Sequence, residues 1–125
     1  LARVHALLRR IGYREAATVQ PLTFGDIVVD LKRHRVTKSR REVDLTATEF
    51  QLLSTLVRAA GRVLPHRYLL SEVWGPQYAD EIQYLRLYIR YLRQKLEDDP
   101  NQPHLITTEW GIGYRMRAPD EPASA

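Results

Sequence analysis

The chain has 125 residues, of which 44% are hydrophobic and 27% charged, a balance typical of a globular domain with a modest core. No apolar run approaches the roughly 20 residues that a bilayer span needs, so we expect no membrane partner. Cysteine is absent, which excludes disulfides and thiolate chemistry and suits a reducing compartment, and we expect the protein to be cytoplasmic. The net charge of +4 points weakly toward a polyanionic partner.

The two ends of the chain look different from its middle. The sequence begins at Leu1 rather than Met, and apolar residues recur at helical spacing up to Ile11, so we expect residues 1–12 to be the remnant of a helix from a preceding domain. Residues 13–21 lack periodicity and end in Pro, which is typical of a linker. Residues 118–125 are acidic and contain Pro, and we expect a disordered tail. One domain should span residues 22–117.

Residues 22–45 alternate short β-prone runs with turn residues. The connections between these runs are too short for crossovers, so they favour an antiparallel meander of four strands. The predicted strands are residues 22–24, 27–31, 35–37 and 42–45.

Three helices are predicted next. Thr46 and Glu49 have the spacing of a capping box, so the first helix should begin at Ala47, and it should end near residue 60, before Gly61. A second helix should cover residues 66–74 and a third about residues 80–96. The third has the strongest apolar stripe, formed by Ile82, Leu85, Ile89, Leu92 and Leu96.

The opposite side of this third helix is polar and basic. A helix that enters the major groove needs donors for bases and phosphates on one side and apolar anchoring on the other. An ordinary solvated charged face is the competing interpretation, and periodicity alone gives it equal weight. No acidic residue between Leu85 and Leu96 neutralises the face, which favours DNA contact. The side carries Gln83, Leu87, Arg90 and Gln94, flanked by Arg86, Tyr91 and Arg93.

A β-hairpin should close the domain, with strands at residues 105–108 and 114–117. Gly111 and Gly113 permit a tight turn, which would carry Trp110, Tyr114 and Arg115 toward a phosphate backbone. Packing within the protein is the alternative for Trp110. For Trp74, at the end of the second helix, a core position and a phosphate contact are equally compatible with the sequence.

Nothing in the sequence indicates catalysis. The four histidines lie outside metal-ligand spacing, no serine sits in a nucleophile-elbow motif, and the carboxylates form no evident pair. We therefore expect no metal, no cofactor and no enzyme.

Four segments together resemble one family, the effector domain of OmpR/PhoB-type response regulators, over residues 22–117. They are LTATEFQLLSTLVRAAGRVL, LLSEVWG, YLRLYIRYLRQKLEDDP and ITTEWGIGYRM. The opening LARVHALLRR resembles the last helix of the receiver domain that precedes this effector. The resemblance implies an α+β fold, a winged helix-turn-helix with an N-terminal antiparallel four-stranded sheet, three helices and a C-terminal β-hairpin wing. The third helix would be the recognition helix.

The resemblance also implies a mechanism. A sensor histidine kinase would phosphorylate the receiver domain, and a homodimer of the full-length protein would then bind direct repeats in double-stranded promoter DNA. The domain would act as a transcription activator, with the loop at residues 75–80 facing RNA polymerase. Within the family, the third-helix segment is most similar to regulators of high-affinity potassium-transport operons, which implies such an operon as the target.

Matching positions carry the family's DNA contacts onto this chain. Recognition-helix contacts fall on Arg86, Leu87, Arg90, Tyr91 and Arg93, and backbone or wing contacts fall on Trp74, Thr108, Trp110 and Tyr114. The chain departs from the family at Arg86, where Asp is common, at Tyr91, where Arg is common, and at Trp110, where the wing tip is often basic. Pro65 also replaces the usual Ser cap of the second helix. With Gln83, Gln94 and Arg115 these contacts complete the predicted DNA-binding site.

One rival from another class remains. The third helix could be the docking surface of a protein-interaction module, with Leu87, Tyr88 and Tyr91 forming an apolar patch. Binding through such a patch would vary little with salt, whereas binding to phosphates would vary strongly.

Overall fold

Two antiparallel sheets and three α-helices make up the part of the chain that the structure, a computed structural model, describes, which is residues 20–119 and residue 121. The helix expected at residues 1–12 and nearly all of the expected linker lie outside the described residues. The elements in chain order are β1 (Leu22–Phe24), β2 (Ile27–Asp30), β3 (Arg35–Lys38), β4 (Arg41–Glu42), α2 (Ala47–Arg58), β5 (Val63–Pro65), α3 (His66–Val73), the 3-10 turn η1 (Pro76–Tyr78), α4 (Ile82–Leu96), β6 (Ile106–Glu109) and β7 (Gly113–Met116).

The N-terminal sheet has the strand order β1-β2-β3-β4, which is the predicted meander. Its inner face buries Phe24, Ile27 and Val29 because alternate residues of a strand point to the same side. The prediction was wrong for the fourth strand, which is Arg41–Glu42 rather than residues 42–45. Among residues 43–45, only Val43 makes a backbone hydrogen bond to the sheet, from its amide to the Val36 carbonyl at 2.8 Å. The chain then leaves the sheet and enters α2.

The capping box of α2 is confirmed. The Glu49 amide donates to Thr46 Oγ1 at 3.2 Å, and the Thr46 amide donates to Glu49 Oε1 at 2.9 Å. These two bonds satisfy amides that have no partner within the helix.

In contrast, α3 begins after Pro65 without any side-chain cap. The His66 amide instead donates to the Ile112 carbonyl at 3.1 Å, so the β6–β7 hairpin supplies the missing acceptor.

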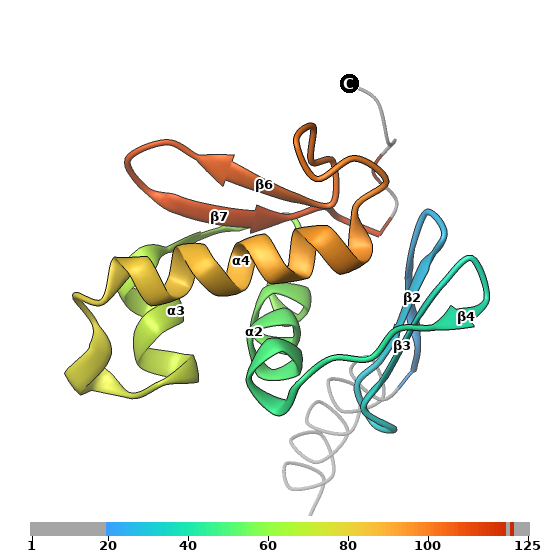
Figure 1. Cartoon of the computed structure of the whole chain (residues 1–125), viewed down its shortest axis with the longest axis horizontal. Coiled ribbons are helices and arrows are strands. Elements are labelled where there is room, and N and C mark those ends of the chain that lie inside the picture. Colours follow the sequence, from blue (N-terminus) through green and yellow to red (C-terminus); the bar gives the residue numbers. More distant parts are fainter. Residues whose placement is uncertain (1–19, 120, 122–125) are drawn as a thin grey trace, which may run out of the picture.

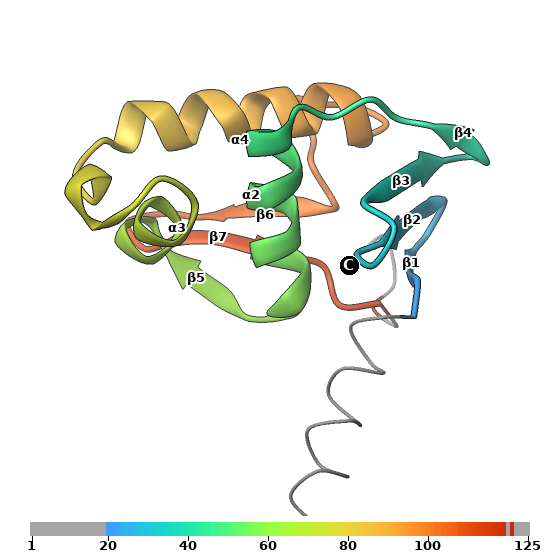
Figure 2. The same ribbon diagram turned by 90° about the horizontal axis from the view of Figure 1, so that it is seen from below.

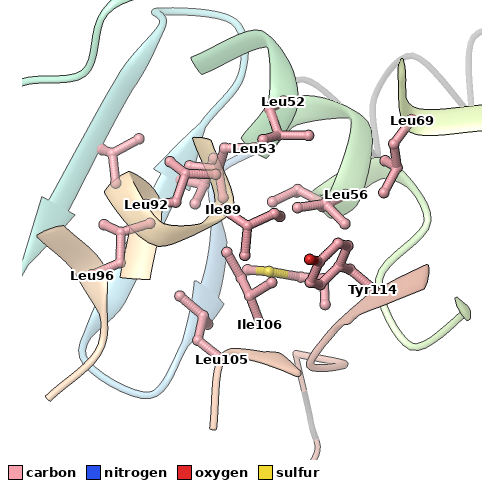
Figure 3. Close-up of a cluster of buried hydrophobic side chains, with 14 of the residues drawn as sticks. Leu52, Leu53, Leu56, Leu69, Ile89, Leu92, Leu96, Leu105, Ile106 and Tyr114 are labelled. Atoms are coloured by element: carbon pink, nitrogen blue, oxygen red, sulfur yellow. The ribbon is translucent and has the colours of Figure 1, made fainter. Parts of the chain in front are cut away.

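The core lies where the three helices meet the hairpin (Figure 3). Leu52, Leu53 and Leu56 of α2 and Ile89, Leu92 and Leu96 of α4 are at most 1% exposed, and Leu105, Ile106 and Tyr114 join them from the other side. Ile82, the first residue of the predicted α4 stripe, is only partly buried, because it lies in the first turn of the helix. The stripe of α4 therefore fixes one side of this helix to the body of the domain.

The second sheet has the order β5-β7-β6, so the predicted C-terminal hairpin is present and carries an additional strand. No strand was predicted between the first two helices, whereas Val63–Pro65 pairs with β7. Gly113 makes this close pairing possible, since a Cβ atom there would lie 1.8 Å from the Leu64 carbonyl oxygen. The fold is the predicted winged helix-turn-helix.

The arrangement of the layers places one side of α4 at the surface (Figure 1, Figure 2). The N-terminal sheet lies at one end of the domain, beside the C-terminal part of α4. The β6–β7 hairpin runs alongside α4, and its turn lies at the opposite end, near the start of that helix. The hairpin and α4 thus form the two long edges of one surface.

Candidate nucleic-acid interface

The outward side of α4 holds most of the predicted site residues on one helix. Leu85, Ile89 and Leu92 face the core, and a rotation of 100° per residue leaves the remaining positions outside. Leu87 is 39% exposed, a large fraction for an aliphatic side chain in the middle of a helix. The exposed predicted residues are Gln83, Arg86, Leu87, Arg90 and Gln94, while Tyr91 and Arg93 are half-buried.

Arg86 and Arg90 have no ion pair or hydrogen bond from their side chains to any other residue that the structure describes. They stand one helical turn apart on the same face. A guanidinium has five N–H donors and remains charged, so both side chains retain their full capacity for an external acceptor. Two such groups on one face suit acceptors such as phosphate oxygens and the O6 and N7 atoms of guanine.

Arg93 differs, because it is bonded inside the domain. Its Nε and Nη2 donate to the Ile106 carbonyl at 3.0 and 2.9 Å, and Nη2 also donates to Thr108 Oγ1 at 2.7 Å. The guanidinium carbon lies 5.6 Å from the centre of the Tyr114 ring, a cation–π distance. Burial lowers the pKa of the Arg93 guanidinium and raises the pKa of the Tyr114 phenol. Arg93 therefore joins α4 to strand β6.

Lys95, the last cation of the helix, is also engaged. Its Nζ donates to Glu49 Oε1 at 2.6 Å and to the Asp44 carbonyl at 2.8 Å. The same carboxylate oxygen of Glu49 accepts from the Thr46 amide, so Lys95 ties α4 to the capping box of α2. This role follows from the folded arrangement, since 46 residues separate Lys95 from Glu49.

The C-terminal end of α4 depends on a residue that the sequence analysis missed. Glu97 is only 7% exposed, and its two carboxylate oxygens accept hydrogen bonds from the amides of His104, Leu105 and Ile106 at 2.8 to 3.0 Å. Charge-assisted bonds to a buried carboxylate are among the stronger hydrogen bonds in proteins. Glu97 thus fixes the start of β6 to the end of α4, and no local sequence signal marks it.

A cleft lies between the hairpin and α4. It has a volume of about 450 Å³ and is lined by His66, Arg86, Arg93, Thr108, Trp110, Gly111 and Tyr114. The structure therefore brings four of the predicted wing and helix residues together with Arg86. His66, at the start of α3, was not among the predicted residues, because nothing in the chain near it indicates that the hairpin lies beside it.

The predicted hairpin residues differ in how they are held. Trp110 is 88% exposed at the turn, whereas Tyr114 is 5% exposed and its ring packs in the core against His66 (Figure 3). The side chain of Arg115 donates to the Gly61 carbonyl and forms an ion pair with Glu121 at 2.6 Å. Consecutive residues of a strand point to opposite faces, so Arg115 lies on the other side of the sheet from Tyr114 and outside the cleft. Glu121, within the predicted tail, is in contact with the hairpin sheet.

Trp74 lies in an aromatic cluster at the end of α3. Its ring stacks on Tyr84 at 6.4 Å and meets the edge of Tyr88 at 5.2 Å, and it is partly buried against the core. The adjacent turn passes through Gly75, at φ +115°, into η1, and an Arg67–Asp80 ion pair connects α3 to the segment before α4. The indole body is thus a packing element, and only part of it faces solvent.

Residues 20–119 and 121 contain neither a metal-binding cluster nor a membrane-spanning helix. No group of three histidine, aspartate or glutamate side chains there is placed to hold a metal ion. Within the same residues, no helix combines the length and the apolar character that crossing a bilayer requires.

The fold and the surface of α4 define a winged helix-turn-helix domain, and sequence comparison places it in a family. A family model described as "Transcriptional regulatory protein, C terminal" matches residues 40–116. The chain therefore belongs to this family of OmpR/PhoB-type transcription regulators.

Particular relatives extend the similarity over most of the chain. It is 44% identical over 119 residues to the KDP operon transcriptional regulatory protein KdpE of Escherichia coli, which covers 93% of this chain and 53% of that protein. It is 46% identical to the transcriptional regulatory protein KdpE of Mycobacterium tuberculosis, over 94% of this chain and 52% of that protein. The chain thus spans about half the length of the curated relatives it matches.

Solved structures agree with the fold. The RstA DNA-binding domain of Klebsiella pneumoniae, crystallised in complex with the RstA box, superposes with a TM-score of 0.71 at 27% identity, covering 78% of this chain and 97% of that chain. DrrB of Thermotoga maritima, an OmpR/PhoB homolog, superposes with a TM-score of 0.69 at 29% identity, covering 91% of this chain and 52% of that chain.

Proposed function

We propose that this domain binds double-stranded DNA sequence-specifically, with α4 in the major groove and the β6–β7 hairpin against the neighbouring backbone. The observation that carries the proposal is the pair of guanidinium groups, Arg86 and Arg90, that no described residue engages, on the outward side of a helix whose other side is buried. A helix held in this way can enter the groove as a rigid body. The relative RstA, whose DNA-binding domain was crystallised with its RstA box, supports this use of the fold.

The side chains on this face match the chemistry of base edges. Arg90 can donate two hydrogen bonds to the O6 and N7 atoms of guanine, and the Gln83 and Gln94 amides suit adenine N6 and N7. Leu87 can contact the methyl group of thymine. Arg86 faces both the groove side and the cleft, so we assign it to a phosphate beside the hairpin.

Around the cleft, Thr108 and Trp110 lie on the side that would face the duplex. Tyr114 can contribute only through the small exposed part of its ring. Contact through Arg115 would require release of its ion pair with Glu121, so we assign no DNA contact to it in this conformation. Trp74 would reach a phosphate only through the exposed edge of its indole.

We further propose that the whole protein is a response regulator that controls a potassium-transport operon, as the similarity to the two KdpE proteins suggests. A sensor histidine kinase would act on a receiver domain outside this chain, and the full-length protein would bind promoter DNA as a homodimer. The loop at residues 75–80 would face RNA polymerase. Normal promoter activation after replacement of this loop would contradict that last assignment.

The test is the affinity for promoter duplexes, including a candidate potassium-transport promoter, as a function of salt. Phosphate contacts release counterions, so we expect log Kd to rise linearly with log salt, with a slope of about 0.9 per phosphate contacted. The rival docking surface is smaller than the sequence suggested, because Tyr88 packs inward on Trp74 and leaves Leu87 and Tyr91. Binding that is absent at low salt, or that is indifferent to salt, would contradict the proposal.

A further inference from the structure

The tip of the β6–β7 hairpin presents two large apolar side chains to solvent. Trp110 is 88% exposed and Ile112 is 55% exposed, although both are large hydrophobic residues. Gly111 between them has φ +79°, and no atom lies within 4 Å of the place where its Cβ would be. The tip therefore projects into open space on this side, and the indole has no aromatic partner within the described residues.

The end of the hairpin around its turn also has no cationic side chain that could form an ion pair with phosphate, and Arg115 on β7 is already paired with Glu121. Residues 105–114 contain no Lys or Arg, and their one charged residue is Glu109, directly before Trp110. A carboxylate at the tip opposes the approach of a phosphate group, so residues 105–114 cannot bind the backbone through ion pairs. The large side chains at the tip, Trp110 and Ile112, offer mainly apolar and aromatic surface.

The position of the tip indicates what this surface meets. Trp110 lines the cleft that contains Arg86, and it also lines a neighbouring cleft of about 510 Å³ together with Asn101 and Thr107. The hairpin runs alongside α4, with its turn near the start of that helix (Figure 1). With α4 in the major groove, as proposed above, the tip would face the adjoining backbone and minor groove.

We propose, building on the proposed DNA binding, that Trp110 is a specificity-determining residue: its indole packs on deoxyribose rings and base edges in the minor groove and selects deformable DNA there. Apolar side chains that enter this groove widen it and partly unstack a base step. Pyrimidine–purine steps permit this readily, whereas stiff A-tracts keep a narrow, electronegative groove that attracts cations. The domain should therefore prefer TA or CA steps beneath the hairpin.

Footprinting first locates the half-site that α4 binds. The experiment then uses two duplexes that share this half-site and differ only beneath the hairpin. One duplex has TA and CA steps there, and the other has an A-tract. Affinities are measured over a salt series for the wild type, Trp110→Ala and Trp110→Arg. Val63→Ala is the matched control, since Val63 is an exposed apolar residue of the same sheet that does not line either cleft. At 88% exposure, Trp110 can be replaced without loss of packing.

We expect Trp110→Ala to weaken binding to the flexible duplex roughly tenfold, within the range for loss of one aromatic–base contact, and to leave the salt slope unchanged. Trp110→Arg should steepen the slope by about 0.9 and shift the preference toward the A-tract. In a Trp74→Phe background, the fluorescence of Trp110, then the single indole of the chain, should change when DNA binds.

Equal affinities of the wild type and Trp110→Ala, or a wild-type preference for the A-tract, would overturn the inference. These outcomes are separate from failure of the proposed function, in which the wild type would bind neither duplex and replacement of Arg90 would have no effect.

Discussion

The cations of α4 fall into two groups that contain the same kinds of residue and behave differently. Arg86 and Arg90 project from the helix with no partner among the described residues, whereas Arg93 and Lys95, one turn further along, are bonded to a carbonyl, a hydroxyl and a buried carboxylate. In the sequence the four belong to a single basic cluster. Only the first pair is available to an external anion.

This difference separates two uses of positive charge on one helix. The first pair can contribute to DNA affinity and its salt dependence. The second pair holds α4 against β6 and α2, and so fixes the orientation in which the first pair is presented. Substitutions in the two groups should therefore change different measurable quantities.

The largest effect is expected at Glu97, a buried carboxylate that, like Arg93 and Lys95, holds α4 to the rest of the domain. Glu97→Ala should lower the free energy of unfolding by about 3 kcal/mol, because three backbone amides lose their acceptor and two of them belong to buried residues. Urea unfolding measures this change. Glu97→Gln keeps one acceptor oxygen, so its free energy of unfolding should fall clearly less. A fall below about 1 kcal/mol for Glu97→Ala would contradict the role of Glu97 as the acceptor that fixes β6 to α4.

Replacement of Arg90 tests the first pair, Arg86 and Arg90, which projects from the helix. Arg90→Ala should weaken binding to the preferred duplex by about 1–3 kcal/mol and relax the choice of base, as expected for loss of a bidentate contact. Its free energy of unfolding should change by less than about 0.5 kcal/mol. Fluorescence anisotropy with labelled duplexes gives the affinity, and Arg41→Ala, an exposed arginine on β4 at the far end of the domain, is the matched control (Figure 1). Unchanged affinity would remove α4 from the interface.

Arg93 decides whether the comparison holds, since the sequence predicts a DNA contact there and the structure shows internal bonds. Arg93→Ala should lower the free energy of unfolding by about 1.5 kcal/mol, because the Ile106 carbonyl and the Thr108 hydroxyl lose a charged donor. Arg93→Lys should recover only part, since an ammonium cannot donate to both acceptors in the same planar fork. Full stability combined with uniformly weaker DNA binding would instead support a phosphate contact.

Substitutions of Lys95 and Arg86, one from each group of cations, should have opposite effects on stability and on DNA binding. Lys95→Ala should reduce the free energy of unfolding by about 1 kcal/mol, because its partner Glu49 is nearly buried, and should leave the salt slope of DNA binding unchanged. Arg86→Ala should have the opposite profile, with unchanged stability and a slope lower by about 0.9. Equal effects of the two substitutions on the slope would show that both cations meet the duplex.

The smallest effect concerns an exposed ion pair within the N-terminal sheet, where Asp26 contacts Lys38 and Ser39. Hydrogen bonding from Ser39 and the nearby Lys38 ammonium lower the pKa of Asp26 below its ordinary 3.8. A lowered pKa in the folded state means that Asp26 stabilises the domain above this pH and that the contribution disappears as the pH falls through the folded value. Asp26→Asn should thus cost roughly 0.2–1 kcal/mol at neutral pH, and this cost should shrink as the pH is lowered below 3.8, as measured by urea unfolding.

The predictable parts of the fold are those determined by nearby residues. The capping box of Thr46 and Glu49 and the apolar stripe of α4 follow from spacings of three and four residues, and both are confirmed. Strand β5 was missed because three residues carry no periodic pattern, and Val63 pairs only with a residue 52 positions later in the chain, at Arg115. The predicted fourth strand was too long because the apolar residues at 43 and 45 pack on the core, and of the two only Val43 still makes a hydrogen bond to the sheet.

The candidate site shows the same division. Periodicity identified which side of α4 is exposed, because the buried stripe is local. It could not separate Arg90 from Arg93, since the fate of Arg93 depends on the Ile106 carbonyl beyond the end of the helix. The role of Glu97 depends likewise on amides seven to nine residues later, which fold back onto it.

The hydrogen bond from the His66 amide to the Ile112 carbonyl has a consequence for how the domain can be observed. This bond joins the first residue of α3 to the hairpin, so the hairpin cannot swing away without exposing that amide to water. The rate at which the His66 amide exchanges its proton for deuterium should therefore report how often the hairpin opens, and slower exchange in the presence of a ligand would show that the ligand holds the hairpin closed.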